Sequence, residues 1–155
     1  MVLTIATLTA CSSNDGSVAI ENTVDACAPL ALVSAEPTEI QRAGIDGAMT
    51  LWRDRGAPAL GLRAGATLEV RFDDAASNFH GLYDDAAQVI YINRDIASDQ
   101  VLSIVIAHEL GHAFGLQHVP RSERVSVMNP ANTDTPPTAE DQAMVQALWG
   151  TCESR

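Results

Sequence analysis

The sequence predicts an α+β domain, and two observations carry that prediction. Apolar residues alternate with polar ones in some stretches and recur at helical spacing in others, so both strands and helices are expected. Their order is strand, helix, several strands, helix, loop and helix, which is typical of α+β folds with a mixed sheet. A chain of 155 residues with 46% hydrophobic and 19% charged residues suits one globular domain.

The first elements are a strand and a long helix. The apolar stretch "PLALV" (29–33) predicts the strand. Pro37 and Thr38 then open a helix that ends at "RGAP" (55–58), because glycine and proline interrupt helices. The residues that recur at helical spacing in it are Ile40, Ala43, Gly44, Ala48, Leu51 and Trp52.

Four further strands are predicted in the middle of the chain. "ALGLR" (59–63) and "TLEVRF" (67–72) precede a polar loop over 73–78, and the second alternates apolar and polar residues. "FHGLY" (79–83) and "QVIYIN" (88–93) are expected to be joined by an acidic turn. These strands would form most of the sheet.

Two helices complete the predicted fold. Ser98 is a suitable N-cap for a second helix containing "VLSIVIAHELGHAF", which Gly115 would end. A Pro/Thr-rich loop (133–138) separates it from an amphipathic helix over 139–150, where Thr138 and Asp141 are placed to form a capping box. The second helix carries the residues that point to a function.

The stretch "HELGHAFGLQH" (108–118) has the spacing of a zinc site. His108 and His112 lie one helical turn apart, so both imidazoles can bind one ion, and Glu109 is placed to act as a base. A positive φ at Gly115 would fold the chain back and bring His118 to the same ion as a third ligand. The alternative is a metal-free histidine cluster, in which three buried polar rings would each need partners.

These residues resemble the signature motif of a known clan of proteins. His108-Glu109-x-x-His112-x-x-Gly115-x-x-His118 is similar to the long zinc signature of the metzincin endopeptidases, and Met128 stands where that clan has its Met-turn. "AMTLWRD" (48–54) and "TAEDQAMVQALWG" (138–150) resemble the matrixin branch. The resemblance spans roughly residues 30 to 150. It implies a mixed, mostly parallel, twisted sheet with an active-site helix, a backing helix and a C-terminal helix.

The resemblance also implies an activity. A monomeric domain over 27–155 would hydrolyse peptide bonds with one catalytic Zn²⁺ on His108, His112 and His118 and with Glu109 as general base. A peptide or protein substrate would lie along the edge strand "FHGLY". One alternative is a non-catalytic zinc-binding surface lipoprotein on the same fold, although zinc binding alone would not require Glu109. A hydrolase of a non-peptide amide is another.

The chain departs from the metzincin pattern in two places. Pro130 stands where some branches have a metal-binding tyrosine. His80 is the only histidine outside the motif, so we interpret the structural zinc of matrixins as lost and His80 as a polar residue near the cleft. Acidic side chains could supply a Ca²⁺ site or be ordinary surface carboxylates. They are Asp73, Asp74, Asp84, Asp85 and Asp95.

The N-terminus and the cysteines predict export. Residues 1–11 resemble the end of a bacterial lipoprotein signal, with Cys11 as the lipidated residue, but lack a basic start; a plain apolar stub is the alternative. Residues 12–26 are predicted to be a flexible tether. Cys27 and Cys152 are candidates for a disulfide in an oxidising compartment, or else two buried thiols.

The predicted location is extracellular or in the cell envelope, with membrane attachment only through a lipid on Cys11. The net charge is −11, and the sequence contains no cluster of basic residues. Polyanions need such a cluster, so nucleic acid is excluded as a partner.

Overall fold

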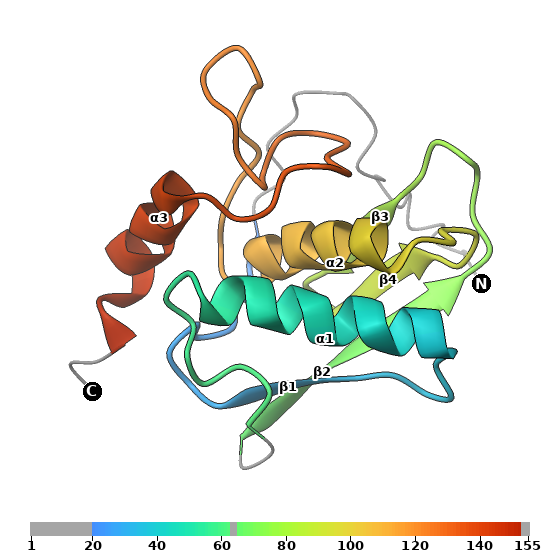
Figure 1. The fold of residues 1–155 in the computed structure, drawn as a ribbon. Coiled ribbons are helices and arrows are strands. Elements are labelled where there is room, and N and C mark those ends of the chain that lie inside the picture. Colours follow the sequence, from blue (N-terminus) through green and yellow to red (C-terminus); the bar gives the residue numbers. More distant parts are fainter. Residues whose placement is uncertain (1–19, 63–64, 153–155) are drawn as a thin grey trace, which may run out of the picture.

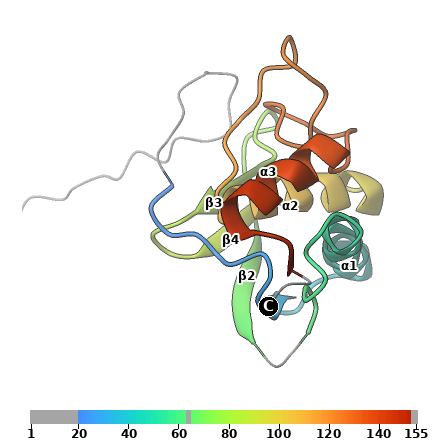
Figure 2. The same cartoon turned by 90° about the vertical axis from the view of Figure 1, so that its left-hand side faces the viewer.

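A computed structural model describes residues 20–62 and 65–152, and its fold is α+β as predicted. The predicted signal remnant, Cys11 and the first part of the predicted tether lie outside these residues. In chain order the elements are β1 (Leu30–Val33), α1 (Glu39–Arg53), β2 (Ala66–Asp73), β3 (Gly81–Asp84), β4 (Val89–Asn93), α2 (Asp99–Ala113) and α3 (Ala139–Trp149). Figures 1 and 2 show α1 and α2 together on one face of the sheet, with α3 near the C-terminal end of α2.

The sheet is mixed and mostly parallel, in the order β1-β2-β4-β3. β1 and β4 both run parallel to β2, whereas β3 runs antiparallel to β4. The alternation predicted for β2 is present, because Leu68 and Val70 are buried while Arg71 is exposed. β3 begins at Gly81, two residues later than predicted, and forms an edge of the sheet.

Helix α1 supports α2 through close packing. Thr38 and Gln41 form a capping box that starts α1 where the sequence predicted. A Cβ atom on Gly44 would lie only 2.5 Å from Cβ of Leu102, so a larger residue there would push the helices apart. The buried indole of Trp52 donates a hydrogen bond to the backbone oxygen of Ala107 (2.8 Å). This bond fixes α1 to the turn of α2 that precedes the histidines.

The strand predicted over 59–63 is wrong. The described part, residues 59–62, forms a turn with one parallel bridge between Leu30 and Leu60. Gly61 has φ +85°, and its N–H bonds the Leu30 oxygen at 2.7 Å. This positive φ bends the chain away from strand geometry. Of the two leucines in the turn, Leu60 is buried and Leu62 is exposed.

The N-terminal segment 20–26 packs against the domain, which differs from the flexible tether expected there. The Val24 N–H bonds the Ala113 oxygen (2.7 Å), and the Asn22 oxygen accepts from the Tyr83 hydroxyl (3.0 Å). Cys27, which follows this segment, forms a disulfide with Cys152, 125 residues away. The segment is therefore held at its C-terminal end to the last described residues of the chain.

Helix α3 closes the domain near the end of α2. Thr138 and Asp141 form the predicted capping box, and Gly150 caps the C-terminus with φ +77°. The Trp149 indole donates to the Phe114 oxygen (2.8 Å), which ties α3 to the last turn of α2. No helix within residues 20–62 and 65–152 has both the length and the apolar character needed to cross a bilayer.

Candidate metal centre

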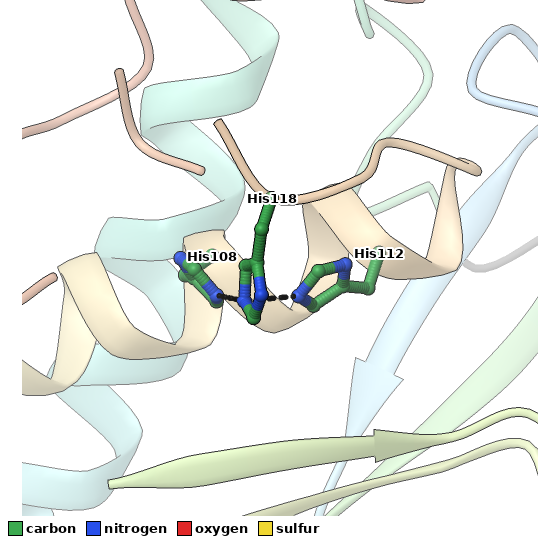
Figure 3. A group of neighbouring side chains, drawn as sticks. All are labelled: His108, His112 and His118. Carbon is green, nitrogen blue, oxygen red and sulfur yellow. Dashed lines mark hydrogen bonds between the residues drawn. The ribbon is translucent and has the colours of Figure 1, made fainter. Parts of the chain in front are cut away.

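The last turns of α2 place His108 and His112 on one face, and the following turn brings His118 to them. Gly115 has φ +97°, as the sequence predicted, and its N–H bonds the His112 oxygen (2.8 Å). The Leu116 N–H bonds the Gly111 oxygen (2.9 Å), so the helix ends in a Schellman motif. Figure 3 shows the three rings pointing toward one another.

The spacing of the ring nitrogens fits one metal ion. Nε2 of His118 lies 3.2 Å from Nε2 of His108 and 3.2 Å from Nε2 of His112. The potential ligand atoms of the three residues all lie within 4.8 Å of one another. Two nitrogens each about 2.0–2.1 Å from a tetrahedral zinc ion would be about 3.3 Å apart. The two separations of 3.2 Å are close to that value.

The hydrogen bonds of two rings explain why a cation would suit this cluster. Nδ1 of His108 donates to the Val127 oxygen (2.7 Å), and Nδ1 of His112 donates to the Leu116 oxygen (2.8 Å). Each neutral ring then has a lone pair on Nε2. His118 Nε2 carries at most one proton, so it can satisfy only one of these two lone pairs. A shared cation satisfies both, and carbonyl partners of this kind orient metal-binding histidines.

The electrostatic environment keeps the rings neutral. Burial is the main cause that lowers the pKa of His108 to about 4 and that of His112 to about 3, and the charges of neighbouring histidines contribute to both shifts. Metal ions bind the neutral imidazole, so the site is in its ligand form at neutral pH. His108 is buried, whereas His112 and His118 are partly exposed, which leaves one side of the cluster open.

Glu109 lies between the histidines and the sheet edge. Its side chain is buried, and Oε2 accepts a hydrogen bond from the Tyr83 N–H of β3 (2.8 Å). A Cβ atom on Gly81 would lie 2.9 Å from Oε1, so glycine is what allows β3 to approach the carboxylate. The sequence indicated Glu109 as a base, but nothing in it indicated that β3 would hold this carboxylate.

Met128 packs under the turn of α2 that contains Gly111. The turn around Met128 is called the methionine turn below. It is fully buried, and its sulfur contacts the position that a Cβ atom of Gly111 would occupy. This contact accounts for a glycine inside a helix, where alanine would be about 1 kcal/mol more favourable. The Met128 oxygen accepts from the Val119 N–H (3.0 Å), which connects the methionine turn to the segment carrying His118.

Asp141 holds this methionine turn, a role that the sequence did not reveal. Its buried carboxylate accepts from the Val127 N–H (2.9 Å) and from the Ser126 hydroxyl (2.5 Å). Arg124 lies 3.4 Å from the same carboxylate. Because the Val127 oxygen orients His108, Asp141 supports the metal centre from α3. The capping box was the only signal for Asp141 in the sequence.

The remaining candidates divide between the site and the surface. His80 lies in the wall of a small cavity beside Glu109 and His108. The aspartates considered for calcium do not gather: within the described residues, only His108, His112 and His118 form a group that could hold a metal. Arg94 instead lies 3.1 Å from Asp74 and 3.9 Å from Asp73, so the calcium hypothesis finds no support.

Comparison with known proteins agrees with this geometry. The model of the Matrixin peptidase family matches residues 41–150, which include most of α1, the histidine motif, the methionine turn and α3. No curated protein matches the chain. The family match covers more than half of the chain, and its residues include those that bring the three histidines together. The chain therefore belongs to the matrixin family.

Proposed function

We propose that this protein is a zinc-dependent endopeptidase. The observation that carries the proposal is the convergence of three histidine Nε2 atoms beside a buried glutamate, in a chain of the matrixin family. His108, His112 and His118 would hold the zinc ion. When bound, zinc supplies Lewis-acid chemistry that activates water and polarises a peptide carbonyl.

Glu109 moves the protons in this proposal. Its carboxylate accepts a proton from the attacking water and returns it to the amine released from the broken peptide bond. The Tyr83 N–H holds Oε2 at 2.8 Å, which fixes the carboxylate in one orientation. Burial removes competing water from the carboxylate, so proton transfer within the site is favoured.

The edge strand β3 is suited to bind an extended peptide. The His80 oxygen accepts from the Asn93 N–H (3.0 Å), on the β4 side of the strand. Backbone groups alternate in direction along a strand, so those of Gly81 and Tyr83 face away from β4. The Tyr83 bond to Glu109 agrees with this direction. A peptide pairing with this edge would therefore pass beside Glu109.

Glu109→Gln tests the proposal, because glutamine retains an acceptor for the Tyr83 N–H but cannot act as the base. Zinc-loaded parent and variant would be incubated with a quenched peptide library, and zinc content would be measured for both. We expect equal zinc and a 10²- to 10⁴-fold loss of cleavage in the variant, about the contribution of a general base. Equal zinc with no cleavage by either protein would instead favour a binding role.

We also propose that the protein is exported. The Cys27–Cys152 disulfide supports this, because such bonds persist in oxidising compartments. Attachment to a membrane through a lipid on Cys11 is part of the same proposal. Mass spectrometry of the protein from its native source tests it, since a lipidated N-terminal Cys11 would appear as a diacylglyceryl adduct. An intact apolar N-terminus without lipid would contradict the attachment.

A further inference from the structure

Residues 74–80, called the β2–β3 connection, have to pass the end of β4. In the sheet β4 lies between β2 and β3, so the connection crosses from one side of β4 to the other. β2 runs parallel to β4 and ends at the same level, because Asp73 pairs with Asn93. β3 runs antiparallel and begins there, where Gly81 pairs with Ile92. Asn93, the last residue of β4, therefore lies where the connection crosses.

The side chain of Asn93 holds this connection in place. It is buried, and its Nδ2 donates to the backbone oxygens of Ala76 (3.3 Å) and Phe79 (3.0 Å). Its Oδ1 accepts a hydrogen bond from the Asp95 N–H (3.0 Å). Both amide protons are therefore bonded to the connection, and the bond from Asp95 fixes the direction in which the amide faces.

Few other interactions order the β2–β3 connection. Residues 76–78 are exposed, so they gain little from packing. The Asn93 N–H donates to the His80 oxygen (3.0 Å). Within the described residues, this bond and the two side-chain bonds of Asn93 are the only hydrogen bonds that join the backbone of the connection to another part of the fold. Arg94 lies 3.1 Å from the Asp74 carboxylate, but both side chains are exposed, so this ion pair contributes little.

Two of the three bonds reach the residues immediately before the proposed peptide-binding edge. Phe79 and His80 precede Gly81, where β3 begins and where it approaches Glu109 most closely. β3 has a neighbouring strand on one side only, so the order of its first residues depends on β4 and on the connection before it. An edge that is ordered in advance loses less conformational entropy when a peptide pairs with it, and the peptide binds more tightly.

We propose that Asn93 is a positioning residue for substrate binding, because its amide holds the β2–β3 connection so that the β3 edge is ordered before a peptide arrives. Asn93 acts through Phe79 and His80 and contacts neither the peptide nor the metal. The role requires a donor, and an aspartate of the same shape has none for the two carbonyl oxygens when ionised. This inference rests on the proposed endopeptidase function.

Asn93→Ala and Asn93→Asp test this role in the zinc-loaded full chain, with kcat and KM measured for a peptide that the library identifies as cleaved. Alanine removes both donors, so we expect KM to rise about 3- to 10-fold. Aspartate also turns a negative charge toward the two carbonyl oxygens, so KM should rise by about 10-fold or more. We expect kcat to stay within about threefold of the parent, because loss of edge order lowers only the fraction of molecules ready to bind.

Two further measurements do not depend on turnover. The Kd of the same peptide for zinc-loaded Glu109→Gln should rise by the same factor as KM when Asn93→Asp is added to that variant. Amide hydrogen exchange over residues 79–83 should be about 10-fold or more faster in Asn93→Asp than in the parent, because the connection opens more often. Exchange within α2 should be unchanged, and so should the zinc content.

Two control variants separate this role from a general loss of stability. Asn78→Ala, in the exposed part of the same connection, should keep the parent KM. Thr38→Ala removes the side chain that caps α1 and should lower the temperature of thermal unfolding. It should leave KM and the exchange over residues 79–83 unchanged, because the cap bonds only within the first turn of α1.

The outcomes separate this inference from the proposed function. A folded, zinc-loaded Asn93→Asp that keeps the parent KM would overturn the inference and leave the function intact. An equal rise of KM in Thr38→Ala would overturn it as well, since the effect would then follow from stability alone. Zinc-loaded parent that cleaves no peptide would overturn both. If Asn93→Asp fails to fold, Asn93→Ala decides by the same criteria.

Discussion

The two sides of Glu109 are built differently. On the metal side, His108 and His112 are each oriented by a backbone carbonyl, and the methionine turn behind them is held by Asp141. On the substrate side, β3 is an edge strand, and His80 Nδ1 has no partner. On the first side the three histidine Nε2 atoms converge, whereas the second side contains the one buried side-chain nitrogen or oxygen of the described residues that has no hydrogen bond.

This contrast indicates that the two sides of Glu109 have different roles. Residues that position a metal must be held rigidly, because small displacements weaken both binding and catalysis. Residues that select a substrate can remain unsatisfied, since the bond they lack is what distinguishes one ligand from another. Substitutions on the metal side should therefore lower zinc binding, whereas substitutions on the substrate side should leave zinc binding unchanged.

The largest effect is expected from His118→Ala on the metal side. Losing one of three proposed ligands should abolish tight zinc binding and, with it, all peptide cleavage. Zinc content after dialysis, measured by mass spectrometry, checks this. His80→Ala is the comparison on the substrate side and should retain zinc. If His118→Ala bound zinc as tightly as the parent, the ligand assignment would be wrong.

Removing the disulfide should destabilise the fold without changing the metal site. Cys27→Ser with Cys152→Ser opens a loop of 125 residues, and the chain-entropy account expects a loss of about 4–5 kcal/mol in unfolding free energy. Urea denaturation measures this loss, with the parent under reducing conditions as control. Zinc content of the folded variant should equal that of the parent, because neither cysteine contacts the histidines.

Asp141→Asn should weaken the support behind the metal side. The variant cannot satisfy both the Val127 N–H and the Ser126 hydroxyl as the carboxylate does, and it leaves Arg124 without its buried partner. A loss of about 2–3 kcal/mol in stability is expected, with weaker zinc binding. Asp134→Asn is the matched control, since Asp134 is exposed in its ion pair with Arg121 and should change stability by under about 1 kcal/mol.

Mild acid should lower the unfolding free energy of the metal-free protein by less than the Asp141→Asn substitution does. His108 and His112 have folded pKa values of about 4 and about 3, below the ordinary 6.5, so the unfolded chain binds protons that the folded chain does not. Stability is therefore full above pH 6.5 and falls as pH decreases toward the folded values. Between pH 7 and 6 the loss should be roughly 1 kcal/mol. Chelator-treated protein that became more stable over this interval would contradict the buried, neutral rings.

The metal side was largely predictable from sequence, because one short stretch encodes it. The spacing of His108 and His112 and the turn at Gly115 follow from local backbone geometry alone. The start of α1 at Thr38 and the caps at Ser98 and Thr138 were likewise local, and all three are confirmed. Local rules failed at the strand predicted over 59–63, because Gly61 makes its described part, residues 59–62, a turn.

The substrate side and the support at Asp141 required the fold. His80 and Asn132 meet at one cavity although 52 positions separate them in the sequence, and no local pattern encodes that meeting. The Asp141 bond to Val127 spans 14 residues and two structural elements. Segment 20–26 was expected to be a tether because it is polar, but its backbone finds partners at Asp85 and Ala113. Long-range partners of this kind become visible only once the chain is folded.

The most direct test of the account is X-ray absorption spectroscopy at the zinc edge of the metal-loaded protein. We predict three imidazole nitrogens and one exchangeable oxygen ligand at about 2.0–2.1 Å, with the same spectrum for Glu109→Gln. Fewer than three imidazoles, or a sulfur ligand at about 2.3 Å, would contradict the central claim that His108, His112 and His118 together form the zinc site.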